Sequence, residues 1–423
     1  MKHSKLAAVA AAGVAIGLAL AGCSSGSSST GSSSSDQKVT LTFWNGFTGG
    51  DRPGYQQIVA DWNKSHPNIQ VDMTVESWDT IEAKLPAAWL TGSGPDIAAP
   101  SSDPNAVGDY VKTNSVLPIT DTGTGSTQID TKAFAPGLTQ EFTYNGKLYG
   151  VPANYATLSL YYNKKAFTAA GLQPPKTVAD FQADAKKLTG GTTQYGLVLA
   201  DNQTIQMWPI LQWLEGGDIV DSKGCSVVQT PAGQNSLSSW AKLVTDDKIS
   251  PVGLTGAQAD SLFGAGKAAM EMNGPWAGAT YKADGIDYGV VPIPTGVDGK
   301  SATLGSTAPL AISAKTKYPK QAQEFLAYWT SKSTQEQFSL TTGFPPVRSD
   351  LTSDPKLTAD PTISVFQSQV SDARQYLPQV KNATKVDSDA YTTLIGQITR
   401  GTPVSQATKQ AQQTINSLTG CSS

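Results

Sequence analysis

The spacing of apolar residues near residue 40 constrains the fold of this chain more than any other feature. Residues 39–43 alternate apolar with polar side chains, as a strand with one buried face does. Apolar residues then recur at helical spacing from Tyr55 until Pro67 stops the helix, and residues 69–75 alternate again. A strand, a helix and a strand of these lengths predict a βαβ unit, and hence an α/β structure around a mostly parallel sheet.

Similar units recur along the rest of the chain. By the same spacing rules we expect helices at 81–90, from Thr177, at 205–214, 237–244 and 322–329, and extended segments near 97, 158–162, 196–199, 268–272 and 289–292. Two helices end the chain, the first up to Gly401 and the second after a Thr402 cap with Pro403 at the first helical position.

The length and composition allow two domains of ordinary size. A hydrophobic fraction of 39% over 423 residues is enough to fill two cores. The formal net charge of -3 and a total of four arginines argue against a nucleic-acid partner or a strongly anionic ligand.

The first residues have the pattern of an export signal. Lys2 and Lys5 precede an apolar run over residues 6–20, which ends in Leu20-Ala21-Gly22-Cys23. This pattern predicts a lipoprotein signal peptide over 1–22, a lipid on Cys23, and a flexible Ser/Gly-rich tether over 23–37. An ordinary signal peptide that happens to contain a cysteine is the alternative, and in both cases the folded part starts near Lys38.

Two cysteines remain after Cys23, and they lie in an oxidising compartment. Cys225 and Cys421 either form a disulfide or stay as free thiols. His66 is the only histidine after the signal peptide, and no Cys/His cluster is present. We therefore expect no metal site and no cofactor.

The nine tryptophans suggest a carbohydrate ligand. Trp44 and Trp78 follow predicted strands, and ligands of open α/β sheets bind outside the carboxyl ends of the strands. Aromatic faces stack on sugar rings, while Asp, Asn and Gln side chains bind the hydroxyl groups. For any one tryptophan, packing in a core is an equally good interpretation.

Several segments together resemble the maltose-type, extracellular family 1 solute-binding proteins. They keep the family order across nearly the whole mature chain and are, in this order, residues 92–97 (Gly-Ser-Gly-Pro-Asp-Ile), 145–152 and 158–164, 268–276 (ending Asn-Gly-Pro-Trp), 288–292 and 324–326. The resemblance implies a two-lobed, type II periplasmic-binding-protein-like fold. Each lobe would hold a mixed, mostly parallel sheet flanked by helices, with three hinge crossings between the lobes.

The resemblance also implies lobe boundaries and a ligand cleft between the lobes. Lobe one would hold residues 38–153 and 306–350, and lobe two residues 154–305 and 351–423. Matching the family pattern position by position, Trp276 would be the stacking platform of lobe two, and Asp103 and Glu76 ligand contacts of lobe one.

Two departures from the family pattern put maltodextrin itself in doubt. Pro100 stands where maltodextrin-binding members have an aromatic residue, and Ala156 stands where they have a carboxylate. The residues that we expect to contact the ligand, in addition to the two strand-end tryptophans and the three positions above, are Asn45, Asp51, Asn154, Tyr155, Gln203, Trp208, Gly305, Ser306 and Arg348.

Two of these candidates have equally simple structural interpretations. Asp51 and Arg52 could form a charge pair at a helix start, where an acidic residue is favoured. Arg348 could be a surface charge beside two prolines.

The resemblance implies the substrate-binding lipoprotein of an ABC importer. Such a protein captures a sugar by hinge closure and delivers it to the permease subunits, acting as a monomer that the lipid on Cys23 holds at the cell surface or in the periplasm. Two alternatives from other classes are a secreted glycoside hydrolase and a surface carbohydrate-binding adhesin. We expect no enzyme, because the sequence has no nucleophile elbow, no histidine-based triad and no metal set.

Overall fold

The structure is a computed structural model that describes residues 38–101, 106–120, 125–135, 137–378 and 380–422. Residues 38–423 form one compact unit. The predicted signal peptide, lipid site Cys23 and tether, as well as Asp103, lie outside the described residues. Within the described ranges, no helix has the length and apolar character needed to cross a membrane.

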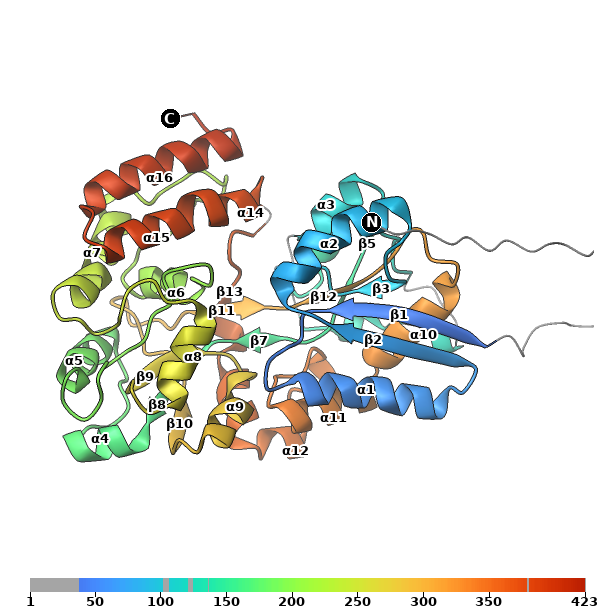
Figure 1. Cartoon of the computed structure of the whole chain (residues 1–423), viewed down its shortest axis with the longest axis horizontal. Coiled ribbons are helices and arrows are strands. Elements are labelled where there is room, and N and C mark those ends of the chain that lie inside the picture. Colours follow the sequence, from blue (N-terminus) through green and yellow to red (C-terminus); the bar gives the residue numbers. More distant parts are fainter. Residues whose placement is uncertain (1–37, 102–105, 121–124, 136, 379, 423) are drawn as a thin grey trace, which may run out of the picture. The chain divides into compact units, whose positions relative to one another are not determined.

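Lobe one, the part around the first sheet, is built on five strands in the order β2-β1-β3-β12-β6 (Figure 1). β1 pairs in parallel with β2 and β3, whereas β12 pairs antiparallel with β3 and β6. The strands are β1 (Val39–Asn45), β2 (Ile69–Val75), β3 (Ile97–Ala98), β6 (Val151–Pro152) and β12 (Pro309–Ile312). The predicted βαβ unit is confirmed, because helix α1 (Arg52–Ser65) connects β1 to its parallel neighbour β2.

The helices of lobe one cover this sheet with aromatic residues. α1 buries Tyr55 and Trp62, and α10 (Pro319–Trp329) buries Phe325 and Trp329 against the same core. The other elements are α2 (Trp78–Thr91), α3 (Val107–Lys112), α11 (Lys332–Thr342) and the two-stranded ladder of β4 (Thr143–Tyr144) and β5 (Lys147–Leu148). α2 begins three residues before the predicted start because the Ser77 hydroxyl accepts a hydrogen bond from the Thr80 amide and caps the helix.

Lobe two, the part around the second sheet, has the strand order β10-β8-β9. β8 (Ser159–Asn163) pairs antiparallel with both β9 (Met270–Asn273) and β10 (Tyr288–Val291). Single parallel bridges from Tyr195 and Val198 lie on the β9 side. The two-lobed α/β fold is confirmed, and the sheet of lobe one is mixed as predicted. The strands of the lobe-two sheet are antiparallel instead of mostly parallel, since hydrophobic spacing shows where a strand is and not which way it runs.

Helices pack around the sheet of lobe two and make its larger core. They are α4 (Lys164–Ala170), α5 (Val178–Leu188), α6 (Met207–Leu214), α7 (Pro231–Thr245), α8 (Gly256–Gly264), α9 (Ala277–Asp284), α14 (Ala383–Lys385), α15 (Thr392–Thr399) and α16 (Val404–Thr419). The predicted cap of the last helix is wrong by one residue. Pro403 takes the cap position, so the Thr402 hydroxyl does not cap α16.

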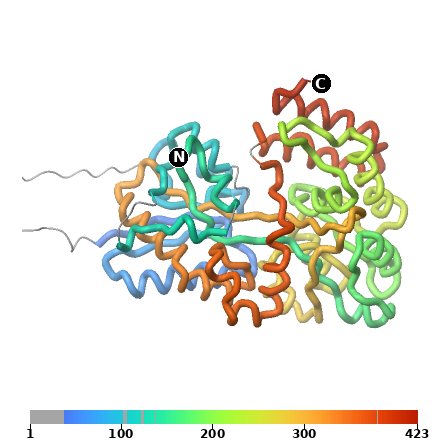
Figure 2. Tube along the Cα trace, turned by 180° about the vertical axis from the view of Figure 1, so that it is seen from behind, coloured from blue at the N-terminus to red at the C-terminus, as the bar shows by residue number. Residues whose placement is uncertain are grey.

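A small sheet of its own lies where the chain passes between the lobes. β7 (Ala156–Thr157), β11 (Thr303–Ser306) and β13 (Ala373–Arg374), labelled in Figure 1, form this hinge sheet in the order β13-β11-β7, and Figure 2 shows the backbone passing between the lobes there. The third passage carries the short helices α12 (Pro355–Thr358) and α13 (Pro361–Ser368), and the Thr157 hydroxyl donates to the carbonyl of Phe366 over 2.9 Å. The residue boundaries predicted for the lobes stay a prediction.

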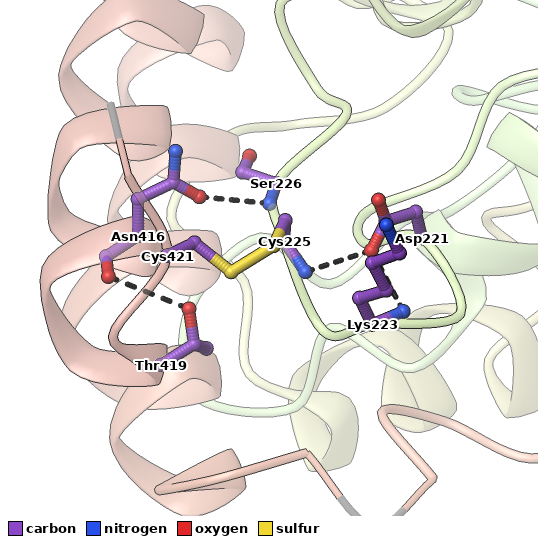
Figure 3. The surroundings of a disulfide bond; sticks show 7 residues. All are labelled: Asp221, Lys223, Cys225, Ser226, Asn416, Thr419 and Cys421. Carbon is purple, nitrogen blue, oxygen red and sulfur yellow. Dashed lines mark hydrogen bonds between the residues drawn. A yellow bond between two sulfur atoms is a disulfide. The ribbon is translucent and has the colours of Figure 1, made fainter.

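A disulfide joins Cys225 to Cys421 within lobe two (Figure 3). It ties the loop after α6 to Cys421, the second residue after the C-terminal end of α16. The Ser226 amide also donates to the side-chain oxygen of Asn416 over 2.9 Å, so a hydrogen bond accompanies the covalent link. Of the two states that the sequence leaves open, the structure has the bridged one.

Candidate ligand-binding site

The β1–α1 loop, residues 46–51, presents aromatic residues from lobe one. The Phe47 ring stacks on the Tyr55 ring with 3.9 Å between centroids, and the Trp78 ring meets Phe47 edge-on at 5.4 Å. A Cβ at Gly46 would lie 2.1 Å from the Trp78 ring, so only glycine leaves room for this indole. Trp78 is half-buried, and one edge of it stays available at the surface.

Asp51 ends this loop as part of a buried chain of hydrogen bonds. Asn154 donates to the Tyr55 hydroxyl over 2.6 Å, and Tyr55 in turn donates to the Asp51 carboxylate. Burial raises the pKa of Asp51 to about 6, although its backbone and Tyr55 hydrogen bonds act in the opposite direction. Within the described part of the chain no ion pair joins Asp51 to Arg52, so the charge-pair interpretation is wrong.

Asn45 and Glu76 lie side by side at the ends of β1 and β2. The Glu76 amide donates to the Asn45 carbonyl over 3.1 Å. The Asn45 side chain accepts from the Phe47 amide, and its Nδ2 has no hydrogen-bond partner among the described residues. The Glu76 carboxylate is partly exposed and pairs with Lys84 at 3.1 Å. Together they place an amide and a carboxylate at one edge of the sheet.

Trp276 is the residue of lobe two that reaches toward this loop. It is half-buried at the start of α9, and it packs against the cores of both lobes. Its ring lies 6.2 Å from the ring of Phe344, a residue of the lobe-one core. A Cβ at Gly49 would lie 3.5 Å from the Trp276 Cβ, which places the β1–α1 loop against this tryptophan.

The hinge sheet holds three further candidates. Gly305 and Ser306 of β11 pair with Thr157 and Ala156 of β7, and both are half-buried. A Cβ at Gly305 would lie 3.1 Å from the Tyr155 hydroxyl, so that tyrosine lies directly over the hinge strand. Burial, together with the nearby charge of Glu141, raises the pKa of Tyr155 to about 12. Tyr155 therefore acts as a neutral donor at physiological pH.

The ligand role predicted for Trp208 is wrong. This residue is 0% exposed in the core of lobe two, and its indole N–H donates to the Ala200 carbonyl over 2.9 Å. An apolar ring on a helix packs in a core as readily as it lines a site, and spacing alone does not separate the two.

Arg348 is neither a ligand contact nor a surface charge. It is buried in lobe one, where it forms a two-point ion pair with Asp350 at 2.9 Å and donates to the Thr330 carbonyl. A second carboxylate, that of Asp130, lies 3.7 Å away. The guanidinium group thus holds two segments of lobe one together.

Two other candidates have surroundings different from those of Trp276 and the β1–α1 loop. Trp44 packs its half-buried ring against the core between α2 and the sheet. Gln203 is exposed in the loop before α6, with a left-handed φ of 68°. The structure therefore brings together Asp51, Trp78 and Trp276 but not these two.

A cavity of about 550 Å³ beside the hinge sheet was not predicted from the sequence. Arg374 of β13 lies over the Trp213 ring at 4.4 Å and pairs with Asp218, which accepts the Trp213 indole N–H over 3.0 Å. Tyr376 also lines the cavity, next to Arg374 in the chain. No local sequence motif predicts that these side chains meet, because Arg374 is far from Trp213 and Asp218 in sequence.

Comparisons with known proteins identify the family and the fold of the chain. The family model described as bacterial extracellular solute-binding protein matches residues 57–365. An uncharacterized ABC transporter extracellular-binding protein of Pyrococcus horikoshii is 26% identical, with 90% of this chain and 87% of that protein covered. The maltotriose-binding protein of Pyrococcus abyssi is 25% identical, with 79% and 72% covered.

A solved structure has the same fold over nearly its full length. The GacH receptor of Streptomyces glaucescens, determined unliganded and in complex with acarbose and an acarbose homolog, superposes with a TM-score of 0.82. It is 25% identical in sequence, with 90% of this chain and 99% of that chain covered.

Proposed function

Because the chain belongs to the family of bacterial extracellular solute-binding proteins, we propose that it captures a sugar between its lobes and delivers it to an ABC importer. The family and the similar proteins are binding proteins, and their names include an ABC transporter component and a receptor for oligosaccharides. The chain is thus a substrate-binding protein that acts outside the cytoplasm. The sugar and its delivery are our proposal.

One observation carries the proposal, and it is the position of Trp276. This indole is half-buried where the two lobes meet, and a carboxylate, that of Asp51, ends the loop that packs against it. An aromatic face next to side-chain oxygens is what a sugar ring requires, because its C–H face is apolar and its edges are hydroxyl groups. Trp78 and Glu76 from lobe one would complete the contacts.

We propose that the cavity beside the hinge sheet extends this surface within lobe two. Arg374 sits one strand from Gly305, since β13 pairs with β11 through Leu304 and Arg374. Its guanidinium can donate several hydrogen bonds in a fixed geometry, and Asp218 holds it in position. We propose that a longer sugar reaches from Trp276 to this cavity.

Capture would occur by hinge closure about the sheet of β7, β11 and β13. A ligand that contacts both lobes binds the closed state better than the open one, and this difference in affinity drives closure. Small-angle scattering should show a smaller radius with bound sugar than without it. Tight binding with an unchanged radius would contradict closure while leaving sugar binding intact.

The sequence of the first residues supports a lipid anchor on Cys23, which we propose holds the mature protein at the outer face of the cytoplasmic membrane. We further propose that it works as a monomer, without enzymatic activity and without a nucleic-acid partner. Mass spectrometry of the protein from its native membrane would show a diacylglyceryl mass at Cys23. An unmodified Cys23 would refute the anchor.

Calorimetry with maltotriose and acarbose tests sugar binding directly. We expect one site on the wild-type chain with a dissociation constant in the micromolar range, which corresponds to about -8 kcal/mol. Trp276→Phe keeps an aromatic face and should weaken binding moderately, whereas Trp276→Ala should weaken it by roughly a hundredfold. No binding of any sugar in a wider panel would refute the proposal.

The same samples distinguish the two rival functions. A glycoside hydrolase would convert bound maltotriose into shorter sugars on incubation, and chromatography would detect them. An adhesin would ignore short oligosaccharides in solution. An intact sugar that binds in solution supports the importer component.

A further inference from the structure

Behind Trp276, two carboxyl groups of lobe two meet without a cation between them. Glu271 lies on β9 and is 1% exposed, and Asp260 on α8 is largely buried beside it. Asn273 and Tyr281 connect the two carboxyl groups, which lie close enough for a hydrogen bond between them to affect the pKa of each. Two carboxyl groups can share a hydrogen bond only if one of them carries a proton.

The other hydrogen bonds of this pair indicate which group holds the proton. The Asn273 amide donates to the Asp260 carboxylate over 2.8 Å, and such a donor favours the ionised form of Asp260. Glu271 accepts a hydrogen bond from the Tyr281 hydroxyl. A protonated Glu271 can still donate its own proton to Asp260, so this assignment gives every group a partner.

The titratable groups around Glu271 are neutral or negative. They are Tyr161 opposite it on β8, Asp260 from α8 and Tyr281 from α9, and Tyr288 from β10 contacts the rings of both tyrosines. No lysine, arginine or histidine forms an ion pair with either carboxyl group in the described part of the chain. Burial, with the charge of Asp260, raises the pKa of Glu271 well above its usual value.

This network holds the turn between β9 and α9, residues 273–276, which is the corner from which Trp276 projects. Asn273 donates to both Asp260 and the Tyr281 hydroxyl, and its side-chain oxygen accepts from the Gly274 amide over 2.8 Å. The Tyr161 hydroxyl donates to the Gly274 carbonyl over 2.9 Å. Both polar groups of Gly274 are therefore fixed from this cluster.

The indole of Trp276 rests directly on Gly274. A Cβ at that glycine would lie 2.2 Å from the Trp276 ring. Any shift of the Gly274 backbone must therefore move the ring. This contact links the buried carboxyl pair to the surface on which the proposed ligand would stack.

We propose that Asp260 and Glu271 share one proton, held on Glu271, and that this shared proton positions Trp276. Removal of the proton would leave two like charges in contact in a buried place, which is strongly unfavourable. The pair would separate, and Asn273 with the Gly274 corner would move with it. Asp260 and Glu271 are thus positioning residues, and their importance for ligand binding rests on the function proposed above.

Fluorine NMR of protein labelled with 5-fluorotryptophan tests the proposal without any ligand. The resonance of Trp276 is the one that disappears in Trp276→Phe, or in Trp276→Tyr if that variant folds better. We expect it to move as rising pH removes the shared proton, while the resonance of the buried core residue Trp240, which packs against Phe181, stays fixed. All spectra are taken in an Asp51→Asn background, because Asp51 lies near Trp276 and titrates at about 6.

Three variants decide the outcome. Glu271→Gln can accept from Tyr281 and donate to Asp260 without titrating, so its Trp276 resonance should stay fixed. Asp260→Asn removes the like charge, so the titration should shift to lower pH. Asp287→Asn, an exposed carboxylate that pairs with Lys164, is the matched control and should titrate as wild type does. A fixed Trp276 resonance in wild type, or the same movement in Glu271→Gln, would overturn the proposal.

Maltotriose binding gives the second readout. Across the same titration the dissociation constant should rise by roughly tenfold in wild type and by less than about twofold in Glu271→Gln. An equal rise in both would overturn the role in ligand binding. Absence of maltotriose binding at every pH would count against sugar capture, and the fluorine spectra would still decide whether the proton positions Trp276.

Discussion

The β1–α1 loop of lobe one and the Trp276 corner of lobe two contact each other but are held in place by different forces. In the loop, rings stack on rings, with Phe47 on Tyr55 and Trp78 against Phe47. In the corner, buried hydrogen bonds fix the backbone of Gly274 under the indole of Trp276. The rings of the loop depend on apolar packing, with the buried Asp51 carboxylate at the end of the loop, whereas the corner depends on a polar network in which we propose a shared proton.

This difference teaches that equivalent parts of a binding site can respond to different conditions. Apolar contacts have no preferred protonation state, so the stacked rings of the loop keep their arrangement over a wide pH range. A buried polar network keeps its geometry only while every group has a partner. We therefore expect the corner to be the more rigid surface near neutral pH and the more sensitive one above it.

The largest predicted effect concerns the disulfide, which only lobe two has in the described part of the chain. Replacing both Cys225 and Cys421 by serine should lower the free energy of unfolding of lobe two by about 2–5 kcal/mol, because the bridge closes a loop of 196 residues. Calorimetric unfolding should separate into two transitions, the earlier from lobe two. A single transition at the wild-type temperature would contradict a stabilising disulfide. Wild-type protein with its disulfide reduced is the control and should behave as the serine variant does.

Much of the fold was predictable from the sequence, because local spacing carries it. The βαβ unit, the helix after Thr177 and the α/β class follow from patterns within about 40 residues, whereas the two-lobed arrangement came from the family resemblance. Strand direction in lobe two was not predictable, since β8 meets β9 more than 100 residues later in the chain. Nothing in a local pattern records such a pairing.

The site was predictable only in part, for the same reason. Trp276 and Asp51 were found from the resemblance and from a loop after a strand, and the structure brings them together. Trp208 was misplaced because a core indole and a site indole have the same spacing on a helix. Asp260 and Glu271 were missed because acidic residues usually lie at the surface, and only packing shows that these two meet.

The second prediction compares the acidic group of the loop with that of the corner. Burial raises the pKa of Asp51 from 3.8 to about 6, so the folded state binds its proton more tightly than the unfolded state does. The contribution of Asp51 to stability is therefore fully present below pH 3.8 and is lost as pH rises through about 6, by roughly 3 kcal/mol in all.

Asp51→Asn should remove this loss and flatten the stability profile over that range. Its amide oxygen can still accept from Tyr55, so the chain of hydrogen bonds persists. Urea unfolding of both proteins at several pH values measures the difference. A wild-type profile that is already flat would show that the carboxylate is better solvated than the structure indicates. Asp109→Asn, an exposed carboxylate, should change nothing.

The third prediction uses two glycines that play the same part in the two surfaces. A Cβ added at Gly46 would lie 2.1 Å from the Trp78 ring, and one added at Gly274 would lie 2.2 Å from the Trp276 ring. Each alanine substitution should therefore cost about 1–3 kcal/mol of stability. Calorimetry with maltotriose should show the larger loss of affinity for Gly274→Ala, because that change displaces the proposed platform. An equal loss for Gly46→Ala would make the two surfaces equivalent.

The smallest stability effect is expected at Glu76, and it separates binding from folding in lobe one. Its ion pair with Lys84 is exposed, with side-chain exposures of 38% and 56%, and such pairs contribute little because solvent screens them. Glu76→Gln should thus change the free energy of unfolding by less than about 0.5 kcal/mol.

Maltotriose affinity should nevertheless fall in Glu76→Gln, by roughly tenfold, if the carboxylate accepts hydrogen bonds from a sugar hydroxyl. Asp109→Asn breaks a comparable exposed pair with Lys112 and is the matched control, which should bind normally. A loss of affinity without a loss of stability would mark the end of β2 as part of the ligand surface. Unchanged affinity would leave the β1–α1 loop and Trp78 as the proposed ligand surface among the described residues of lobe one.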